Sequence, residues 1–537
     1  LRPWQDALAL HVIEEAYMAR RQRMDAMYNI FVVSIVCFML LALGGVIFVL
    51  RQNRKLSLAR LELQQANNRL NISNNDLQRI NEQLAGLNSQ ISEANEVKEE
   101  YIGIFLTMCS EYIDKIIDSR RRVRRLLRDG RIENAALSRP YGAGVRVYDG
   151  LRSIYVYTCD VSESGLLRAA DRAAAAVTDT PKSVGDIKLA ERANADIHPV
   201  KTPFLSVEAS RRAEILRKAD KAARAVSSNI VQVSAGLLSR EQHVLIANSE
   251  GLYTGDTRVY TRLLCSAVAS DGKENQTGTR NPGALMGFEL FDSRVDPEKT
   301  GHDAAQSAVT MLTAPYCAAG EMPVVIAGGF GGVIFHEACG HALEATSVAP
   351  GMSVFAGKLG QQIAAPCVTA IDDGTMPNEW GSENIDDEGT PTTRLVLIEN
   401  GVLKTLLHNR KTAKKAGCKT TGNAAGAGRV APTNLFFKPG RLTQEELLAN
   451  LGDGLFLTEV TGLHAGANPV SGDFSLLSRG YEIKGGKIVR AVEEFTVAGN
   501  FYQLLKDITD VGGDLLFETS PIGSPSVLVK SLSVAGA

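Results

Sequence analysis

An uncharged apolar run near the N-terminus constrains the fold of this chain more than any other feature. Ile30–Leu50 contains 21 consecutive residues without a charged side chain. A helix of that length is about 31 Å long, which matches the hydrocarbon core of a bilayer. We therefore expect an N-terminal helix over 1–29 and a single-pass transmembrane helix over 30–50. A slight excess of basic residues after Leu50 favours a cytoplasmic location for the rest of the chain.

The next segment has the pattern of a coiled coil followed by a basic helix. Apolar side chains recur every seven residues from Leu56 to Ile91, with a second set three positions further on. This spacing predicts a parallel coiled-coil dimer over 56–97. Seven arginines between 120 and 131 predict a basic helical linker over 98–140, solvated or facing lipid. The net charge of −2 argues against a nucleic-acid-binding protein.

The remaining part of the chain has the composition of a folded protein with reduced cysteines. Hydrophobic residues make up 45% of the sequence, which favours a packed core over disorder. The eight cysteines are scattered without a CxxC pair, so neither a disulfide scaffold nor a zinc ribbon is expected. We predict an α+β fold. Its expected elements are a hairpin from Gly144 to Thr158, helices over Leu166–Val177 and Val207–Val226, and a strand over Leu285–Phe291.

One short stretch carries the residue types of a hydrolytic metal site. A strand at Val324–Ile326 leads through a glycine-rich turn into a helix that bears His336, Glu337 and His341. Neutral imidazoles bind zinc, and a neighbouring carboxylate can take a proton from water. We therefore interpret the two histidines as metal ligands and Glu337 as a general base.

The spacing of this motif, HExxxH, requires a distorted helix. Residues i and i+5 lie about 140° apart on a regular α-helix, which is too far for both imidazoles to reach one metal. We expect the distortion beside Gly340, where a bulge is tolerated. The alternative is an ordinary helix with two hydrogen-bonded histidines and an exposed glutamate.

Four segments around the motif closely resemble the TldD family of zinc metalloproteases. They are FGGVIFHEACGHALEATSV (Phe330–Val348), SVFAGKLGQQIA (Ser353–Ala364), IDDGTMPNEWGS (Ile371–Ser382) and NIDDEGTPTTRLVLIENGVL (Asn384–Leu403). The chain is TldD-like over 144–410, whereas 411–537 resembles the PmbA/TldE partner type.

This resemblance implies a peptidase that acts on unfolded or extended peptides. It assigns Zn²⁺ to His336 and His341, and the role of general base to Glu337. It also implies an active site inside a two-subunit shell, formed by a homodimer or by a heterodimer with a PmbA/TldE-type subunit.

Two features depart from the family pattern. The family's first strands, expected before Gly144, are replaced by the membrane and coiled-coil segment. TldD proteins also take a third zinc ligand from a cysteine near the C-terminus, whereas the last cysteine here is Cys418. Two imidazoles alone hold zinc weakly. We expect His464, in a glycine-flanked loop, to substitute, with the carboxylate of Asp473 as the alternative.

Two acidic clusters beside glycine turns have two open interpretations. Their carboxylates could orient the histidine ligands or receive the amino end of a peptide, or they could simply cap strands. The clusters consist of Asp372, Asp373, Asp386, Asp387 and Glu388.

These patterns favour a membrane-tethered zinc peptidase with globular regions at 144–320 and 321–537. The competing hypothesis is a catalytically silent PmbA/TldE-like partner or scaffold. A signalling protein whose output is the coiled coil has little support.

Overall fold

The computed structural model describes residues 18–27, 29–30, 32–35, 37, 120–149, 151–177, 187–329, 332–348, 351, 353–426, 428–461, 470–517 and 522–536. The chain divides into two units, Leu1–Glu100 and Tyr101–Ala537. All described residues of the first unit are helical. Within the described residues, no helix combines the length and apolar character needed to cross a membrane. Most of 30–50, all of 56–97 and residues 98–119 lie outside the described residues, so the transmembrane helix and the coiled coil stay predictions.

The expected basic helix over 98–140 is wrong for its second half. β1 (Arg120–Arg128) and β2 (Arg131–Ser138) form an antiparallel hairpin instead. Asp129 and Gly130 join them with φ of 48° and 76°, as a type I′ turn requires. Asp-Gly is a strong hairpin signal, and the surrounding arginines concealed it. Leu127 is fully buried, which anchors β1 in the core.

A short hairpin and a helix complete the first globular region. β3 (Ala143–Asp149) pairs with β4 (Arg152–Thr158), which confirms the hairpin predicted from Gly144 to Thr158. α2 (Glu163–Ala175) follows β4 and packs on the hairpin. The side chain of Ser162 caps this helix by accepting from the Gly165 backbone N–H at 3.2 Å.

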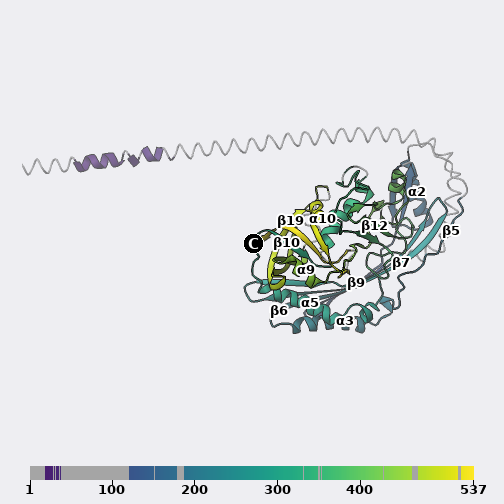
Figure 1. The fold of residues 1–537 in the computed structure, drawn as a ribbon, viewed down its shortest axis with the longest axis horizontal. Helices are drawn as coiled ribbons and strands as arrows, with labels where there is room; N and C mark the ends of the chain where they lie inside the picture. Colours follow the sequence, from purple (N-terminus) through teal and green to yellow (C-terminus); the bar gives the residue numbers. More distant parts are fainter. Residues whose placement is uncertain are drawn as a thin grey trace, which may run out of the picture. The chain divides into compact units, whose positions relative to one another are not determined.

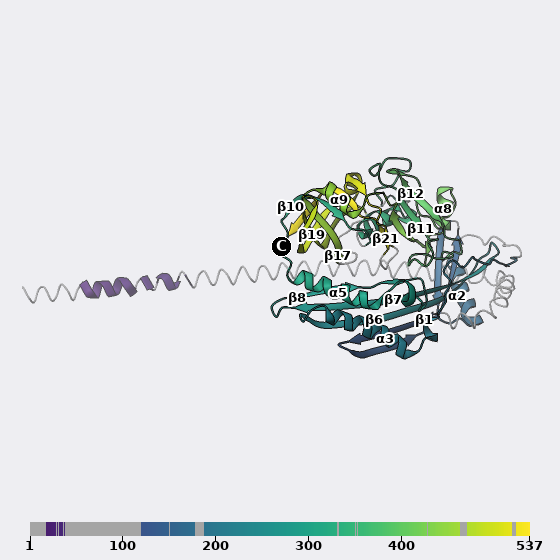
Figure 2. The same cartoon turned by 60° about the horizontal axis from the view of Figure 1, so that its bottom comes forward.

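The central region is a seven-stranded, mostly antiparallel sheet covered by two helices. Its further strands are β5 (Ala190–Glu191), β6 (Ile230–Ala247), β7 (Leu252–Ser270), β8 (Asn275–Arg280) and β9 (Gly283–Ala284). The order is β2-β1-β6-β7-β5, with β8 and β9 also paired to β7. The helices η1 (Phe204–Ser206), α3 (Ala209–Ala225), α4 (Leu290–Ser293) and α5 (Pro297–Leu312) complete it. α3 and α5 pack together, and Figure 2 shows them with the long strands β6 and β7.

The strand predicted over Leu285–Phe291 is wrong. Only Gly283–Ala284 is paired, and the chain then turns into α4. Four apolar side chains of this segment lie in the core, namely Leu285, Met286, Phe288 and Leu290. A short apolar run cannot distinguish a buried strand from a buried irregular segment, so the pattern was ambiguous.

A closed barrel dominates the C-terminal region. It contains β10 (Gly320–Ile326), β17 (Gly454–Thr461), β18 (Asp473–Lys484), β19 (Lys487–Asn500) and β23 (Val527–Gly536). Because β23 pairs with both β19 and β10, the strands form a complete circuit, and β20 (Ile508–Val511) adds to β23. These strands lie near the C-terminus in Figure 1. Closure leaves β10 hydrogen-bonded on both sides, which fixes the position of the segment after it.

The C-terminal region also contains smaller sheets. The largest has the order β13-β12-β11-β16. Its strands are β11 (Ala370–Asp373), β12 (Arg394–Glu399), β13 (Val402–Leu403) and β16 (Leu435–Phe437). Two-stranded ribbons are formed by β14 (Ala424–Ala425) with β15 (Arg429–Val430), and by β21 (Leu516–Phe517) with β22 (Gly523–Ser524). The helices are α8 (Arg410–Ala416), α9 (Gln444–Leu451) and α10 (Phe501–Asp507). The mixture of helices and strands confirms the α+β prediction.

Candidate metal centre

A tight glycine turn leads from the barrel into the motif. Gly329 has φ of 79°, and its backbone N–H donates to the Ser524 carbonyl at 2.8 Å. A Cβ on Gly332 would lie 2.8 Å from the Gly523 carbonyl oxygen, so a side chain there would clash. The close approach of the backbone therefore requires glycine at this position. The turn delivers the chain into α6 (Gly332–Phe335), whose residues are all buried.

The helix changes type at the first histidine. α6 continues into a π-helical turn, η2 (His336–Gly340), and then into a 3₁₀ turn, η3 (His341–Leu343), before α7 (Ala345–Val348). The His341 backbone N–H donates to the His336 carbonyl, which is the i to i+5 bond of a π-turn. The distortion expected from the HExxxH spacing is therefore present, and it includes Gly340.

The π-turn brings the three side chains of the motif together. Ligand atoms of His336, Glu337 and His341 all lie within 4.8 Å of one another. The two imidazole rings have centroids 4.9 Å apart and are nearly perpendicular. The Glu337 carboxylate lies 4.0 Å from His341 Nε2. Two imidazoles that can bind a divalent transition metal, with a carboxylate beside them, are the groups of a hydrolytic metal site.

Packing fixes the position of His336. His336 is only 8% exposed. A Cβ on Gly340 would lie 2.6 Å from Leu435 Cδ2, so the absence of a side chain there allows β16 to pack against the turn. Phe335 contacts Phe437 of the same strand, with ring centroids 4.2 Å apart and the rings tilted by 40°. The turn is thus fixed to the four-stranded sheet.

A carboxylate that the sequence analysis missed orients the second histidine. His341 Nδ1 lies 2.6 Å from Glu344 Oε1. When Nδ1–H donates to this carboxylate, the lone pair of Nε2 is left for a metal, as in many zinc sites. The hydrogen bond to Glu344 also raises the pKa of His341. The signal was present in the sequence, because a carboxylate three residues after a ligand on a helical turn faces it.

The structure does not supply the third ligand from Asp473. This carboxylate, at the start of β18, accepts from Asn500 Nδ2 at 2.9 Å, and that bond lowers its pKa. Among the described residues it is not part of the metal-binding group. His464 lies outside the described residues, so its role stays a prediction.

The buried members of the acidic clusters act as hydrogen-bond acceptors. Asp372 accepts from Asn423 Nδ2 and from the backbone N–H of Thr433, both at 2.7 Å. Asp386 accepts three backbone N–H groups, from Glu388, Thr390 and Ala424. Burial raises the pKa of Asp372 to about 7 and that of Asp386 to about 6. These contacts support the interpretation as structural caps.

Two other members of the clusters, Asp387 and Glu388, join the globular regions. Asp387 pairs with Arg258 of β7 at 2.9 Å. Glu388 accepts from Tyr148 Oη of β3 at 2.8 Å and from the Arg410 backbone N–H at 2.8 Å. The acidic loop therefore fixes the first and central regions against the C-terminal region.

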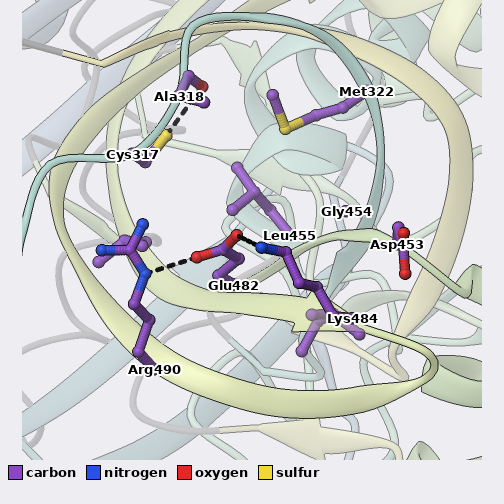
Figure 3. A pocket seen from close by; sticks show the side chains of 11 residues that line it. Cys317, Ala318, Met322, Asp453, Gly454, Leu455, Glu482, Lys484 and Arg490 are labelled. Carbon is purple, nitrogen blue, oxygen red and sulfur yellow. Dashed lines mark hydrogen bonds and ion pairs between the residues drawn. The ribbon is translucent and has the colours of Figure 1, made fainter.

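A small cavity of about 220 Å³ lies at the other end of the barrel. Its lining comes from the beginning of β10 and of β17, the end of β18 and the first half of β19. In Figure 3, Glu482 pairs with Arg490 and Lys484 across it. The metal motif follows the opposite end of β10, so this cavity is separate from the candidate site.

Comparison with known proteins places the chain in a family. Models of the PmbA/TldA metallopeptidase match domain 1 over residues 117–177, the central domain over 202–312 and the C-terminal domain over 319–536. A metalloprotease of Methanothermobacter thermautotrophicus is 30% identical over 464 residues, which cover 82% of this chain and all of that protein. The chain belongs to the PmbA/TldD metallopeptidase family. The domain 1 match begins at residue 117 and so includes residues before Gly144. The expectation that the family's first strands are missing there is therefore wrong.

Other relatives agree with this assignment. The TldD homologue of Buchnera aphidicola (strain APS) is named a metalloprotease and is 26% identical, covering 82% of this chain and 97% of that protein. A solved Thermotoga maritima structure, described as a modulator of DNA gyrase, is 27% identical with a TM-score of 0.69 and covers 81% of this chain and all of that one. TldE from Thermococcus kodakarensis has the same fold, with a TM-score of 0.64 at 21% identity, over 79% of this chain and 98% of its own.

Proposed function

We propose that this chain is a zinc-dependent peptidase that cleaves unfolded or extended peptides. The observation that carries the proposal is the π-turn, which places two imidazoles and a carboxylate within 4.8 Å of one another. The names of the relatives support a metalloprotease. The carboxylate of Glu344 on His341 adds the orienting partner that zinc-binding histidines ordinarily have.

The residues of the motif have different roles in hydrolysis. His336 and His341 would hold the metal, which when bound supplies Lewis acidity and promotes the ionisation of water. Burial fixes the ring of His336, and Glu344 fixes the ring of His341. Glu337 takes the proton of the attacking water and returns it to the leaving amine when the C–N bond breaks.

Metal removal tests this proposal. We expect a strong chelator to abolish cleavage of an unstructured peptide, and added Zn²⁺ to restore it, because an apo site has lost its Lewis acid. The readout is the rate of cleavage by mass spectrometry. Chelator-insensitive cleavage would contradict a metal mechanism, and no cleavage at any Zn²⁺ concentration would favour the silent partner.

The silent-partner alternative has one specific observation in its favour. The sequence has no cysteine after Cys418, so the thiolate ligand expected from the TldD resemblance is absent. In that case the chain would contribute its fold to a shell with a second subunit. We propose such a shell for the active enzyme also, as a homodimer or as a heterodimer with a PmbA/TldE-type subunit.

We propose that His464 completes the zinc site. Replacing it with alanine should lower zinc content while leaving the fold intact, because a third imidazole adds substantially to affinity. Zinc per chain and the far-ultraviolet circular dichroism spectrum should be measured on the same preparations. Equal zinc in variant and parent would eliminate His464 as a ligand.

We also propose that Ile30–Leu50 tethers the enzyme to a membrane as a single pass, with the peptidase region in the cytoplasm. The protein should then remain in the membrane fraction through washes at high salt, because hydrophobic insertion is not screened as surface charge is. Fractionation before and after the wash measures this. Release by salt alone would contradict the tether.

A further inference from the structure

An arginine with an exposed side chain stands beside the metal motif. Arg429 begins β15, the second strand of a small ribbon, and β15 packs against α7 directly after Glu344. Among the described residues, no carboxylate forms an ion pair with its guanidinium. An unpaired cation at a candidate active site is available for a substrate group that is or becomes negative.

Hydrogen bonds connect the segment that carries this arginine to the turn of the second histidine. The Leu407 backbone N–H donates to the Leu343 carbonyl at 3.1 Å, and the Ala345 N–H donates back to Leu407 at 3.0 Å. Two residues further on, Asn409 Nδ2 donates to the Gly428 carbonyl at 3.0 Å. The segment from Leu407 to Asn409 thus hydrogen-bonds both to the turn that carries His341 and to Gly428, the residue before Arg429.

The turn of the ribbon is held by the acidic loop and by an arginine of the first region. The Gly426 backbone N–H donates to Asp387 Oδ2 at 2.6 Å, and Arg146 Nη2 of β3 donates to the Gly426 carbonyl at 2.7 Å. Arg146 in turn pairs with Glu388 at 3.5 Å. These bonds fix the backbone turn that leads into Arg429.

We propose that Arg429 is a catalytic residue that donates hydrogen bonds to the carbonyl oxygen of the peptide bond being cleaved. This inference rests on the proposed peptidase function. As water adds to the carbonyl carbon, the new C–O bond forms, the π electron pair moves onto the carbonyl oxygen, and Glu337 accepts the water proton. Arg429 stabilises the negative oxygen until the C–N bond breaks and the proton passes to the amine. A guanidinium suits this role, because it is always charged and offers several donors.

The test compares Arg429→Ala and Arg429→Lys with Arg217→Ala, which removes an exposed arginine from α3. For Arg429→Ala, we expect kcat to fall by about 10²–10³-fold, with KM within about threefold of the parent value. Arg429→Lys should recover part of this loss, and Arg217→Ala should leave both constants unchanged. Zinc content is measured on every variant and should not change.

A second readout does not depend on turnover. A phosphinic peptide, which carries a negative oxygen like that of the transition state, should bind Arg429→Ala about 10²-fold more weakly than it binds the parent. The control is an uncharged peptide of the same sequence, which binds to the Glu337→Gln variant without being cleaved. When Arg429→Ala is added to that variant, its affinity for this peptide should fall by less than about threefold.

Three outcomes would overturn the proposal. An unchanged kcat in Arg429→Ala would exclude it, with the peptidase function intact. A rise in KM with constant kcat would show recognition of a substrate charge in the ground state instead. Failure of the unmodified protein to cleave any peptide would overturn the proposed function and this inference with it.

Discussion

Replacing Glu337 with glutamine is expected to slow peptide hydrolysis by about 10²-fold or more. Glutamine keeps the size of the side chain and can still hydrogen-bond, but it cannot accept a proton from water. The Glu337 side chain is 12% exposed and lies 4.0 Å from His341 Nε2, so water that reaches the histidines also reaches the carboxylate. Initial cleavage rates of an unstructured peptide give the magnitude.

The metal should stay bound in this variant, because both imidazoles remain. Glu445→Gln, which removes an exposed carboxylate from the first turn of α9, is the matched control and should leave the rate unchanged. Undiminished cleavage by Glu337→Gln, with contaminating proteases excluded, would remove this residue from the mechanism.

Replacing Arg258 with methionine is expected to destabilise the globular region by about 3–5 kcal/mol. The Arg258 side chain is only 5% exposed and contacts three carboxylates, those of Asp256 at 3.3 Å, Glu383 at 3.0 Å and Asp387 at 2.9 Å. Methionine has a similar length but no charge, so the three carboxylates would lose their shared cation, and that of Asp256, only 3% exposed, would stay buried without it. Burial already raises the pKa of Glu383 to about 8, which shows how strongly this environment disfavours negative charge.

Denaturation with urea measures the change in the free energy of unfolding. Arg217→Met, on the exposed face of α3, is the control and should change stability by less than about 0.5 kcal/mol. A loss below about 1 kcal/mol in Arg258→Met would show that the ion cluster does not hold the central and C-terminal regions together.

Local patterns predicted the centre of the candidate site well. The HExxxH spacing identified His336, Glu337 and His341, and the geometry of a regular helix required the distortion that η2 provides. Glu344 was missed, although its distance from His341 along the helix was readable. Arg429 was beyond local reasoning, because β15 lies next to α7 only through contacts between segments far apart in the sequence.

Long-range contacts also decided features that the sequence left open. The acidic residues could be functional or structural until Asp372 was seen to accept from Thr433, 61 residues away. The Asp129–Gly130 turn was readable as a hairpin, but the run of arginines around it suggested a solvated helix. Pairing of β1 in the central sheet and burial of Leu127 in its core override that preference.

Zinc content is the most direct test of the central claim that His336 and His341 form a metal site. The purified full chain should contain close to one zinc per chain by elemental analysis, and His336→Ala and His341→Ala should each lose most of it while remaining folded. A folded parent protein without zinc, or variants that retain the parent's zinc, would contradict the claim.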